Sequence, residues 1–324
     1  MFRDFCLLRF QFMQNHLKGI LYASLTAVLW GVLAIALKVI DKDIEPATIV
    51  WFRFSVAFGI LAAWQAVKNP SSFKLIAKPP LLLIIATLGL SWNYISFMMG
   101  IHYTTPSNTQ LFIQTGPILL ALAGIVFFNE KITRLQFLGF LIAIIGVAFF
   151  YRDQLIAFID AKKEYNLGVI YIFTSAMAWA TYAVLQKKLV KKYSIESLNL
   201  FIFGLPVLLY APFINLEALV HLSWVTWVLL LFVGLNTLFS YTFLSVALKN
   251  TDASKVSIII ILNPIITFIC MDIFTRLDVS WIQHERFSIM SVFGAGLVIV
   301  GAILVAKRQK PKREKQKQII SKPE

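Results

Sequence analysis

The chain has almost no cysteine and unusually little charge. Its two cysteines, Cys6 and Cys270, lie at opposite ends of the 324 residues without a metal-ligand spacing, so we expect no structural disulfide. Charged residues make up 14% of the sequence, whereas about a quarter is usual for a soluble protein. Together with 59% hydrophobic residues, this composition excludes an ordinary soluble enzyme, a disordered protein and a fibre.

Motifs of phosphate and hydrolytic chemistry are missing as well. The sequence has no G-x-x-x-x-G-K-[ST] motif for ATP and no H-E-x-x-H motif for zinc, and its four histidines are far apart. A membrane enzyme acting on a diphosphate would need clustered carboxylates to hold Mg²⁺. Of the 16 acidic residues, only Asp272 falls within an apolar run away from its last turn. We therefore expect no enzyme activity, no cofactor and no metal.

Long apolar runs, by contrast, fill most of the chain. A bilayer-spanning helix needs about 20 mainly apolar residues, and proline, glycine and charged residues divide the sequence into runs of that length. The sequence predicts ten spans, at 19–39, 46–67, 80–101, 106–128, 134–151, 166–186, 197–215, 224–247, 252–275 and 286–306. The predicted fold class is therefore an all-α polytopic membrane protein with ten transmembrane helices.

The 30 Lys and Arg residues are distributed unevenly over the loops. If the N-terminus is cytoplasmic, 22 of them lie on the cytoplasmic side and 7 on the other. Because cytoplasmic loops carry the excess of basic residues, both termini are predicted to be cytoplasmic. The basic run KRQKPKREKQK at 307–317 directly follows the last span, so it indicates topology and contact with anionic lipid rather than nucleic-acid binding.

The two halves of the sequence repeat one another. At offsets of about 150 residues, the first, third, fourth and fifth predicted spans match the sixth, eighth, ninth and tenth at several positions. The matched pairs are Gly19/Gly168, Tyr22/Tyr171, Trp30/Trp179, Lys38/Lys187, Tyr94/Tyr241, Thr104/Thr251, Ser107/Ser254, Pro117/Pro264, Gly139/Gly294 and Gly146/Gly301. Because each half has five spans, an odd number, the second half must insert upside down. Inverted repeats with a site between them are a recurrent design of secondary transporters.

The sequence also carries a set of short motifs. They are the G-x-x-Y…W opening of each half, WFRFSVAF in the second span, GPILLALAGIVFFNEKIT closing the fourth, and the glycine-rich fifth and tenth spans. These motifs resemble the drug/metabolite transporter superfamily, EamA type, which implies a transporter of two inverted five-helix repeats. On this basis we divide the chain into an N-terminal cytoplasmic segment (1–16), a first EamA-like repeat (17–152), a second (166–306) and a basic cytoplasmic tail (307–324).

The resemblance also draws attention to one carboxylate. In the family a Glu often follows the fourth helix of each half, and Glu130 occupies that place in the first half. The matching stretch of the second half, FTRLDVS, has Leu277 instead, with only Asp278 nearby. The two halves therefore differ here. Lys38 and Lys187, although matched across the repeat, lie at helix ends where Lys commonly marks the membrane interface.

Polar and aromatic residues of the spans provide candidates for substrate binding. Such polar groups are expected to face the bundle interior, where they either line a cavity or bond neighbouring helices. Trp30 and Trp179 lie too deep for interfacial residues, so they either pack or offer a stacking surface. The resemblance implies a cavity formed chiefly by the first, third, fourth, sixth, eighth and ninth helices. The substrate-binding candidates are Trp30, Asn93, Tyr94, Gln110, Gln114, Trp179, Tyr182, Asn236, Tyr241 and Asn263.

Ionisable and proline residues provide candidates for gating or coupling. Arg53 and Asp272 are predicted at similar depth in the second and ninth spans, where they could form an ion pair or an outer gate, or extend to the surface. Pro117 and Pro264 each remove a helical hydrogen bond, so we expect kinks that act either as hinges or as static bends. Glu130 completes this set.

Together these features predict a secondary transporter that moves a small organic metabolite by alternating access. Export is one direction of transport that this prediction includes. The expected solute is amino acid-like, nucleoside-like or otherwise mostly uncharged, because only Arg53 offers a deep cation. An integral membrane enzyme acting on a lipid-linked substrate and a channel or sensor are the alternatives, and the repeat argues against both. The expected location is the bacterial inner membrane, as a monomer or homodimer.

Overall fold

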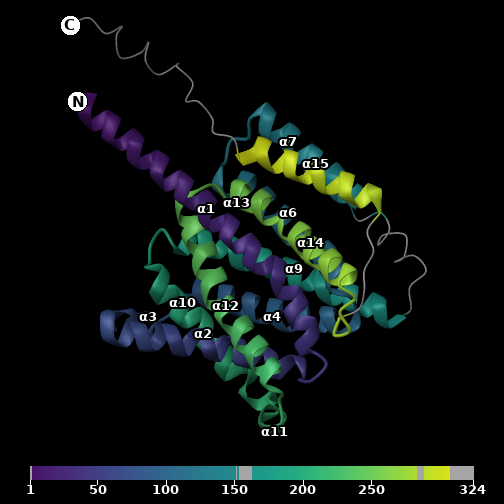
Figure 1. The fold of residues 1–324 in the computed structure, drawn as a ribbon. Helices are drawn as coiled ribbons and strands as arrows, with labels where there is room; N and C mark the ends of the chain where they lie inside the picture. Colours follow the sequence, from purple (N-terminus) through teal and green to yellow (C-terminus); the bar gives the residue numbers. More distant parts are fainter. Residues whose placement is uncertain (1, 151, 153–162, 283–287, 307–324) are drawn as a thin grey trace, which may run out of the picture.

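The computed structural model describes residues 2–150, 152, 163–282 and 288–306, and these residues form helices joined by short turns (Figure 1). The helices of the first half are α1 (Phe2–Ile40), α2 (Pro46–Lys68), α3 (Lys74–Ala77), α4 (Leu81–Tyr103), α5 (Pro106–Phe112), α6 (Thr115–Phe128) and α7 (Arg134–Phe150). Those of the second half are α9 (Lys163–Leu189), α10 (Ile195–Tyr210), α11 (Leu216–Val220), α12 (Trp224–Asn250), α13 (Ala253–Ile260), α14 (Asn263–Arg276) and α15 (Ile289–Ala306). Short 3₁₀ turns precede α3 and follow α10, at Pro70–Phe73 and Ala211–Phe213.

Seven helical stretches of the described residues are long and apolar enough to cross a bilayer. They are Gln14–Ile40, Pro46–Lys68, Leu81–Tyr103, Asn166–Leu189, Ile195–Phe213, Trp224–Asn250 and Ala253–Arg276. Shorter apolar helices occur at Thr115–Phe128, Arg134–Phe150 and Ile289–Val305. The predicted all-helical character is therefore confirmed for the described part of the chain.

We expected the fourth and ninth predicted spans to be continuous, kinked helices. Each is instead broken near its middle. The first break separates α5 from α6 at residues 113–114, and the second separates α13 from α14 at residues 261–262. Pro117 and Pro264 lie in the first turn of α6 and α14, where a missing N–H costs no helical hydrogen bond. Each proline thus begins a new helix instead of bending an old one.

Backbone and side-chain groups together complete the hydrogen bonding at the first break. The backbone N–H of Gly116 donates to the Ile113 carbonyl at 2.9 Å, and the side-chain Nε2 of Gln114 donates to the Gln110 carbonyl at 3.2 Å. The Ser257 hydroxyl donates to the Pro117 carbonyl from α13. The break is therefore tied to the second half of the molecule.

Several other boundaries differ from the predicted spans. Helix α1 begins at Phe2 rather than at residue 19, so residues 2–16 belong to the same helix as the first span, while the stretch able to cross a bilayer begins at Gln14. Helix α9 extends the sixth span at both ends, to Lys163 and Leu189. Helix α10 ends at Tyr210, before the predicted end of the seventh span at residue 215, and it contains Pro206 in its interior. The predicted basic tail, 307–324, lies outside the described residues.

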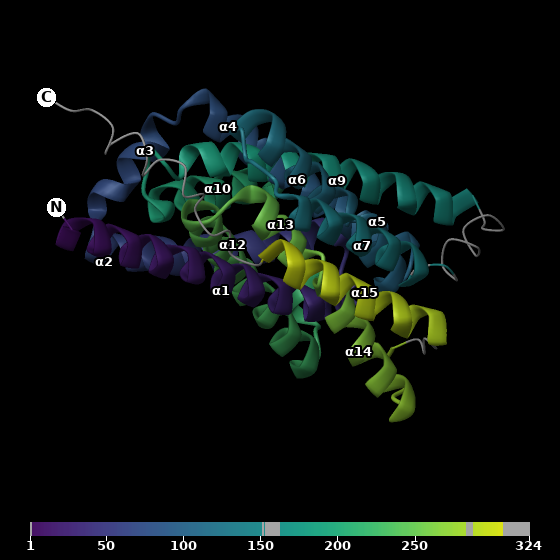
Figure 2. The same ribbon diagram turned by 90° about the horizontal axis from the view of Figure 1, so that it is seen from above.

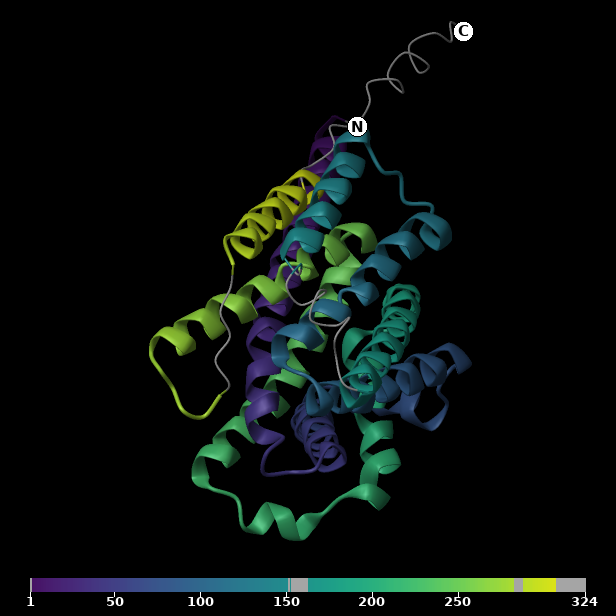
Figure 3. The ribbon, with the colours of Figure 1, turned by 90° about the vertical axis from the view of Figure 1, so that its right-hand side faces the viewer.

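The helices of the two halves pack in corresponding pairs. Helix α1 packs along α12, as α4 packs along α9, and α2 contacts α10. Figure 2 and Figure 3 show α7 and α15 side by side at one edge of the bundle, and the two helices are in extensive contact. Each half therefore completes its core only against the other half.

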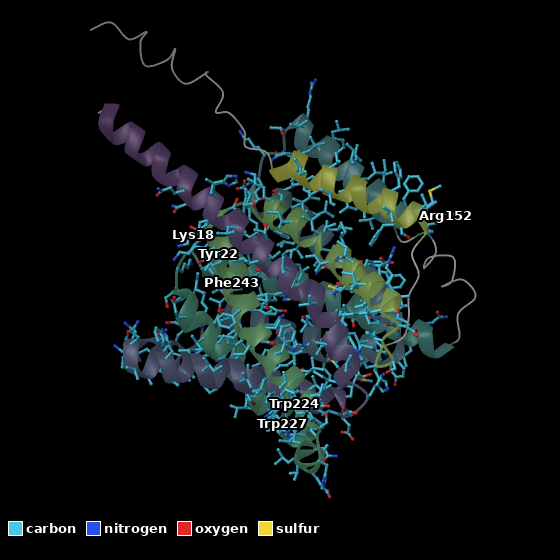
Figure 4. All side chains as sticks on the ribbon, viewed as in Figure 1. Lys18, Tyr22, Arg152, Trp224, Trp227 and Phe243 are labelled. Atoms are coloured by element: carbon cyan, nitrogen blue, oxygen red, sulfur yellow. The ribbon has the colours of Figure 1, made fainter. Side chains whose placement is uncertain are left out.

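Aromatic residues lie near both ends of the long helix α12 (Figure 4). The Phe243 ring meets the ring of Tyr22 on α1 edge to face, with the centroids 5.2 Å apart. Lys18 Nζ lies 6.0 Å from the centroid of the Tyr22 ring. Trp224 and Trp227 occupy the first turn of α12 at the opposite end. Aromatic residues at two levels are typical of the interfaces of a bilayer.

Glycines bring α7 and α15 into backbone contact. A Cβ atom added at Gly294 would lie 2.3 Å from the Phe150 nitrogen and 2.6 Å from the Gly146 carbonyl oxygen. Gly139 and Gly301, the repeat matches of Gly294 and Gly146, face each other in the same way. Small residues at such an interface allow close packing where no hydrophobic effect drives helices together.

We expect Gly294→Ala to lower the thermal midpoint of the detergent-solubilised protein, because overpacking typically costs about 1–3 kcal/mol. Gly296→Ala is the matched control two residues away, since a Cβ atom there meets nothing within 4 Å. Equal midpoints for the two variants would contradict the close α7–α15 contact.

Candidate functional site

A cavity lies at the centre of the bundle, between the two halves. Helices α1, α2, α4, α5, α6, α9, α12, α13 and α14 all contribute to its lining. Eight of the ten substrate-binding candidates line it, namely Trp30, Asn93, Tyr94, Gln110, Gln114, Trp179, Tyr241 and Asn263. Arg53 and Pro117 line it as well. Sequence reasoning missed its apolar lining residues Leu33, Phe97, Ile113 and Ile260, because apolar residues in a span carry no distinguishing signal.

Aromatic rings form one wall of this cavity. The matched Trp30 and Trp179 meet edge to face with their ring centroids 5.7 Å apart. Tyr241 lies 5.4 Å from the Trp30 ring and 5.6 Å from that of the matched Tyr94. Because such rings offer both apolar faces and polar edges, this wall suits a solute that has an apolar part.

Amide side chains at the helix breaks form another wall. Gln114 Nε2 donates to Asn263 Oδ1 at 2.9 Å and so connects the break in the first half to that in the second. Gln110 Nε2 donates to the Trp30 carbonyl at 3.3 Å. The oxygens Gln110 Oε1 and Gln114 Oε1 are buried without a hydrogen-bond donor among the described residues. Buried acceptors of this kind are normally paired, so they are available to a solute.

Two candidates serve helix packing instead of lining the cavity. Asn236 Nδ2 donates to the Leu29 carbonyl at 2.7 Å, which ties α12 to α1. Tyr182 is fully buried, with its ring centroid 5.6 Å from that of Tyr241, and it stands behind the aromatic wall. Asn93 combines both positions, because it lines the cavity while its Nδ2 donates to Ser175 Oγ at 2.7 Å.

Arg53 is buried in the cavity wall, with 2% of its surface exposed. Its Nε donates to Thr237 Oγ1 at 3.1 Å, and its guanidinium carbon lies 4.2 Å from the centroid of the Tyr94 ring. The ion pair that we considered with Asp272 does not form, because Asp272 binds Arg276 one turn away at 2.7 Å on the surface. Asp272 is therefore remote from the cavity. The contact with Thr237 had no signal in the sequence.

Charged residues close one end of the bundle, where α6 and α9 finish and α13 begins; we call it the α13 end. The Glu130 carboxylate accepts hydrogen bonds from the N–H groups of Ala253 and Ser254 at 2.7 and 3.0 Å, which caps α13. It also forms an ion pair with Lys187 at 3.2 Å, and both side chains are more than 90% buried. Lys187 Nζ donates to the Thr251 carbonyl at 2.9 Å. We expected Lys187 at the membrane interface, but it is buried and connects α9 to Glu130 and to the Thr251 carbonyl.

The opposite end, where α1 and α4 finish and α5 begins, lacks this carboxylate; we call it the α5 end. Lys38, the match of Lys187, donates to the Thr104 carbonyl at 2.9 Å, but Leu277 stands in place of the Glu and is exposed. Asp41 pairs with His102 at 3.1 Å near the surface. Burial raises the pKa of the Asp41 carboxyl, and the charges of His102 and Lys38 oppose that shift.

The cavity is small in this conformation, at about 60 Å³. That volume holds only a few water molecules, whereas sites for organic ligands usually measure about 300–1,000 Å³. An organic solute would therefore require the surrounding helices to separate. At the two helix breaks in the wall, the regular backbone hydrogen bonds of the helices are interrupted, so a movement there disrupts fewer of them.

The seven helical stretches that are long and apolar enough to cross a bilayer place the chain in the class of integral multi-pass membrane proteins. The model of the EamA-like transporter family matches residues 17–152 and 166–307. This chain belongs to the EamA-like transporter family.

Named relatives agree with this assignment. The chain is 31% identical over 291 residues to the "Uncharacterized inner membrane transporter YhbE" of Escherichia coli strain K12, covering 89% of this chain and 91% of the relative. It is 30% identical to an "Uncharacterized transporter" of Haemophilus influenzae, covering 90% and 96%. A solved crystal structure with 15% identity and a TM-score of 0.69 covers 90% of this chain and 99% of that one, which shows the shared fold.

We expect Glu130→Gln to destabilise the solubilised protein strongly, because removing one partner of a buried ion pair typically costs about 3–5 kcal/mol. Asp272→Asn serves as the control, since its ion pair with Arg276 is largely exposed and such pairs contribute about 1 kcal/mol or less. The measurement is the thermal midpoint of both variants in detergent. A Glu130→Gln midpoint as high as that of Asp272→Asn would contradict the buried tie.

Proposed function

We propose that this protein is a secondary transporter that carries a small organic metabolite across the membrane by alternating access. The observation that carries the proposal is the central cavity, which is lined by polar and aromatic residues of both halves. A solute bound there touches both repeats at once, so relative movement of the repeats would change the side to which it is exposed. Membership of a transporter family supports the same function.

The proposed architecture has ten spans in two inverted five-helix repeats. It counts the broken pairs α5–α6 and α13–α14 as one span each and includes the short helices α7 and α15. Corresponding contacts support the repeat. Lys38 at the end of α1 donates to the Thr104 carbonyl, as the matched Lys187 at the end of α9 donates to that of the matched Thr251.

The proposed orientation places both termini and the α13 end in the cytoplasm. The 22 basic residues on this side, against 7 on the other, support it through the positive-inside rule. A relative named as an inner membrane transporter supports a location in the bacterial inner membrane. In this orientation Glu130 and Lys187 close the cytoplasmic end, while the α5 end faces outward with weaker ties.

The transport cycle begins when a solute enters from the open side and fills the cavity. Gln114, Asn93 and Asn263 would form hydrogen bonds with it, while Trp30 and Trp179 pack on its apolar part. The solute classes that this lining suits are amino acid-like, nucleoside-like and other mostly uncharged molecules. Movement at the helix breaks near Pro117 and Pro264 would then transfer access, and release of the Glu130–Lys187 tie would open the cytoplasmic end.

An enzyme acting on a lipid-linked substrate has less support. Metal-dependent chemistry on a diphosphate needs grouped acidic ligands, and among the described residues no group of three or more His, Cys, Asp and Glu could hold a metal ion. A channel would require a continuous polar path, whereas the described residues form a small cavity of about 60 Å³. Transport by alternating access remains the proposal.

The direct test is transport by the purified protein in liposomes with a panel of labelled metabolites. We expect at least one solute to move, and Gln114→Ala and Trp30→Ala to reduce its rate about tenfold or more, because each removes a cavity contact. Trp64→Ala is the matched control, since Trp64 is 59% exposed on the outside of α2. The proposed site fails if no solute moves or if both cavity variants transport normally.

The topology has a separate test. We expect reporter fusions after Glu324 and in the connection between α7 and α9 to report opposite sides of the membrane, with the C-terminal fusion in the cytoplasm. Signals from the same side for both fusions would contradict the ten-span arrangement.

A further inference from the structure

Arg53 is a charge in the middle of the protein for which the described residues provide no counter-ion. The ion pairs among these residues involve other side chains, and no Asp or Glu lines the cavity. The side chain is held by one hydrogen bond to Thr237 and by the face of Tyr94. A guanidinium has five N–H donors, and these two contacts satisfy only part of that capacity.

An uncompensated charge inside a membrane protein is expensive, and such residues usually mark the path of a substrate or ion. A purely structural Arg would be expected to have a carboxylate partner or to reach the surface. Arg53 does neither, because it is buried and it faces the cavity. An anionic ligand in the cavity would supply the counter-charge that the described residues do not provide.

The number of charges limits what that ligand is. Arg53 is the only Arg or Lys in the described lining of the cavity, so one negative charge neutralises the site. A phosphate ester or a polyphosphate would bring more charge and require several convergent cations. A carboxylate matches the single guanidinium in charge and in the planar geometry of two parallel hydrogen bonds.

The rest of the cavity complements such a solute. The unpaired oxygens Gln110 Oε1 and Gln114 Oε1 are acceptors, so they require a donor such as an ammonium or amide N–H on the same molecule. The rings of Trp30, Trp179 and Tyr241 cover an apolar part. We infer that Arg53 is a specificity-determining residue that selects solutes with a carboxylate group and provides the counter-charge for that group. This inference rests on the proposed transport function and narrows its substrate class.

The experiment compares matched acids and amides. Purified protein in proteoliposomes is offered the twenty amino acids together with acetate, propionate and benzoate, and then the carboxamide of each, in which a neutral group of similar size replaces the carboxylate. Binding is measured by the shift in thermal midpoint, and transport by uptake of the labelled compound. For every compound that binds or moves, we expect the amide to be weaker by roughly 10- to 100-fold, because a hydrogen-bonded charge is lost.

The variants separate recognition from folding. Arg53→Gln should abolish the preference for acid over amide, and Arg53→Lys should keep part of it because the charge remains. Lys68→Gln is the control, since it removes the same charge from the exposed end of α2 and should keep the full preference. A purely structural role for Arg53 would lower stability without changing the ratio of acid to amide.

The outcomes distinguish this inference from the proposed function. Transport of amides or uncharged solutes as well as of acids by the wild-type protein would overturn the carboxylate preference while leaving transport intact. Stabilisation by acids without movement of any solute would support the Arg53 site and contradict transport. If no acid binds or moves, the inference is overturned, and this result needs no variant to fold.

Discussion

The structure depends on one constraint, which is that a polar group inside a bilayer must find its partner within the protein. The chain meets this constraint mainly with helices, whose backbone groups pair internally. At the two helix breaks, side chains take over this role. The Gln114 amide donates a hydrogen bond to the Gln110 carbonyl, and the Ser257 hydroxyl of the other half donates one to the Pro117 carbonyl. The breaks therefore hold the halves together and produce a polar region at the centre of an apolar bundle.

The same constraint explains the difference between the two ends. At the α13 end, Glu130 satisfies the N–H groups that begin α13 and neutralises the buried Lys187. At the α5 end, the matched Lys38 donates to backbone carbonyls, and Leu277 stands in place of the carboxylate that pairs with Lys187. Among the described residues, the α13 end therefore holds the more extensive set of charged contacts. In the proposed transport cycle, this difference would make the two ends unequally easy to open.

The sequence predicts much of this arrangement because periodic and repeated features carry it. Apolar runs predict the spans, and the matched Trp30 and Trp179, at equal depth in related helices, meet in the cavity. Side-chain partners were harder to predict. The burial of Lys187 beside Glu130 and the separation of Arg53 from Asp272 depend on how helices rotate and where they end. A helix that breaks at a proline instead of bending changes these rotations, and no periodicity in the sequence encodes that choice.

The unpaired groups then acquire a common meaning. Stability alone would favour a carboxylate beside Arg53 and donors beside the oxygens of Gln110 and Gln114, since each unsatisfied group weakens the fold. The protein nevertheless retains the buried Arg53 and the unpaired oxygens of Gln110 and Gln114 together in the lining of the central cavity. A solute large enough to satisfy all of them requires the surrounding helices to separate, because the cavity measures only about 60 Å³. In the proposed transport cycle, binding would therefore favour the conformation with the wider cavity, and this preference is the coupling between occupancy and conformation that alternating access requires.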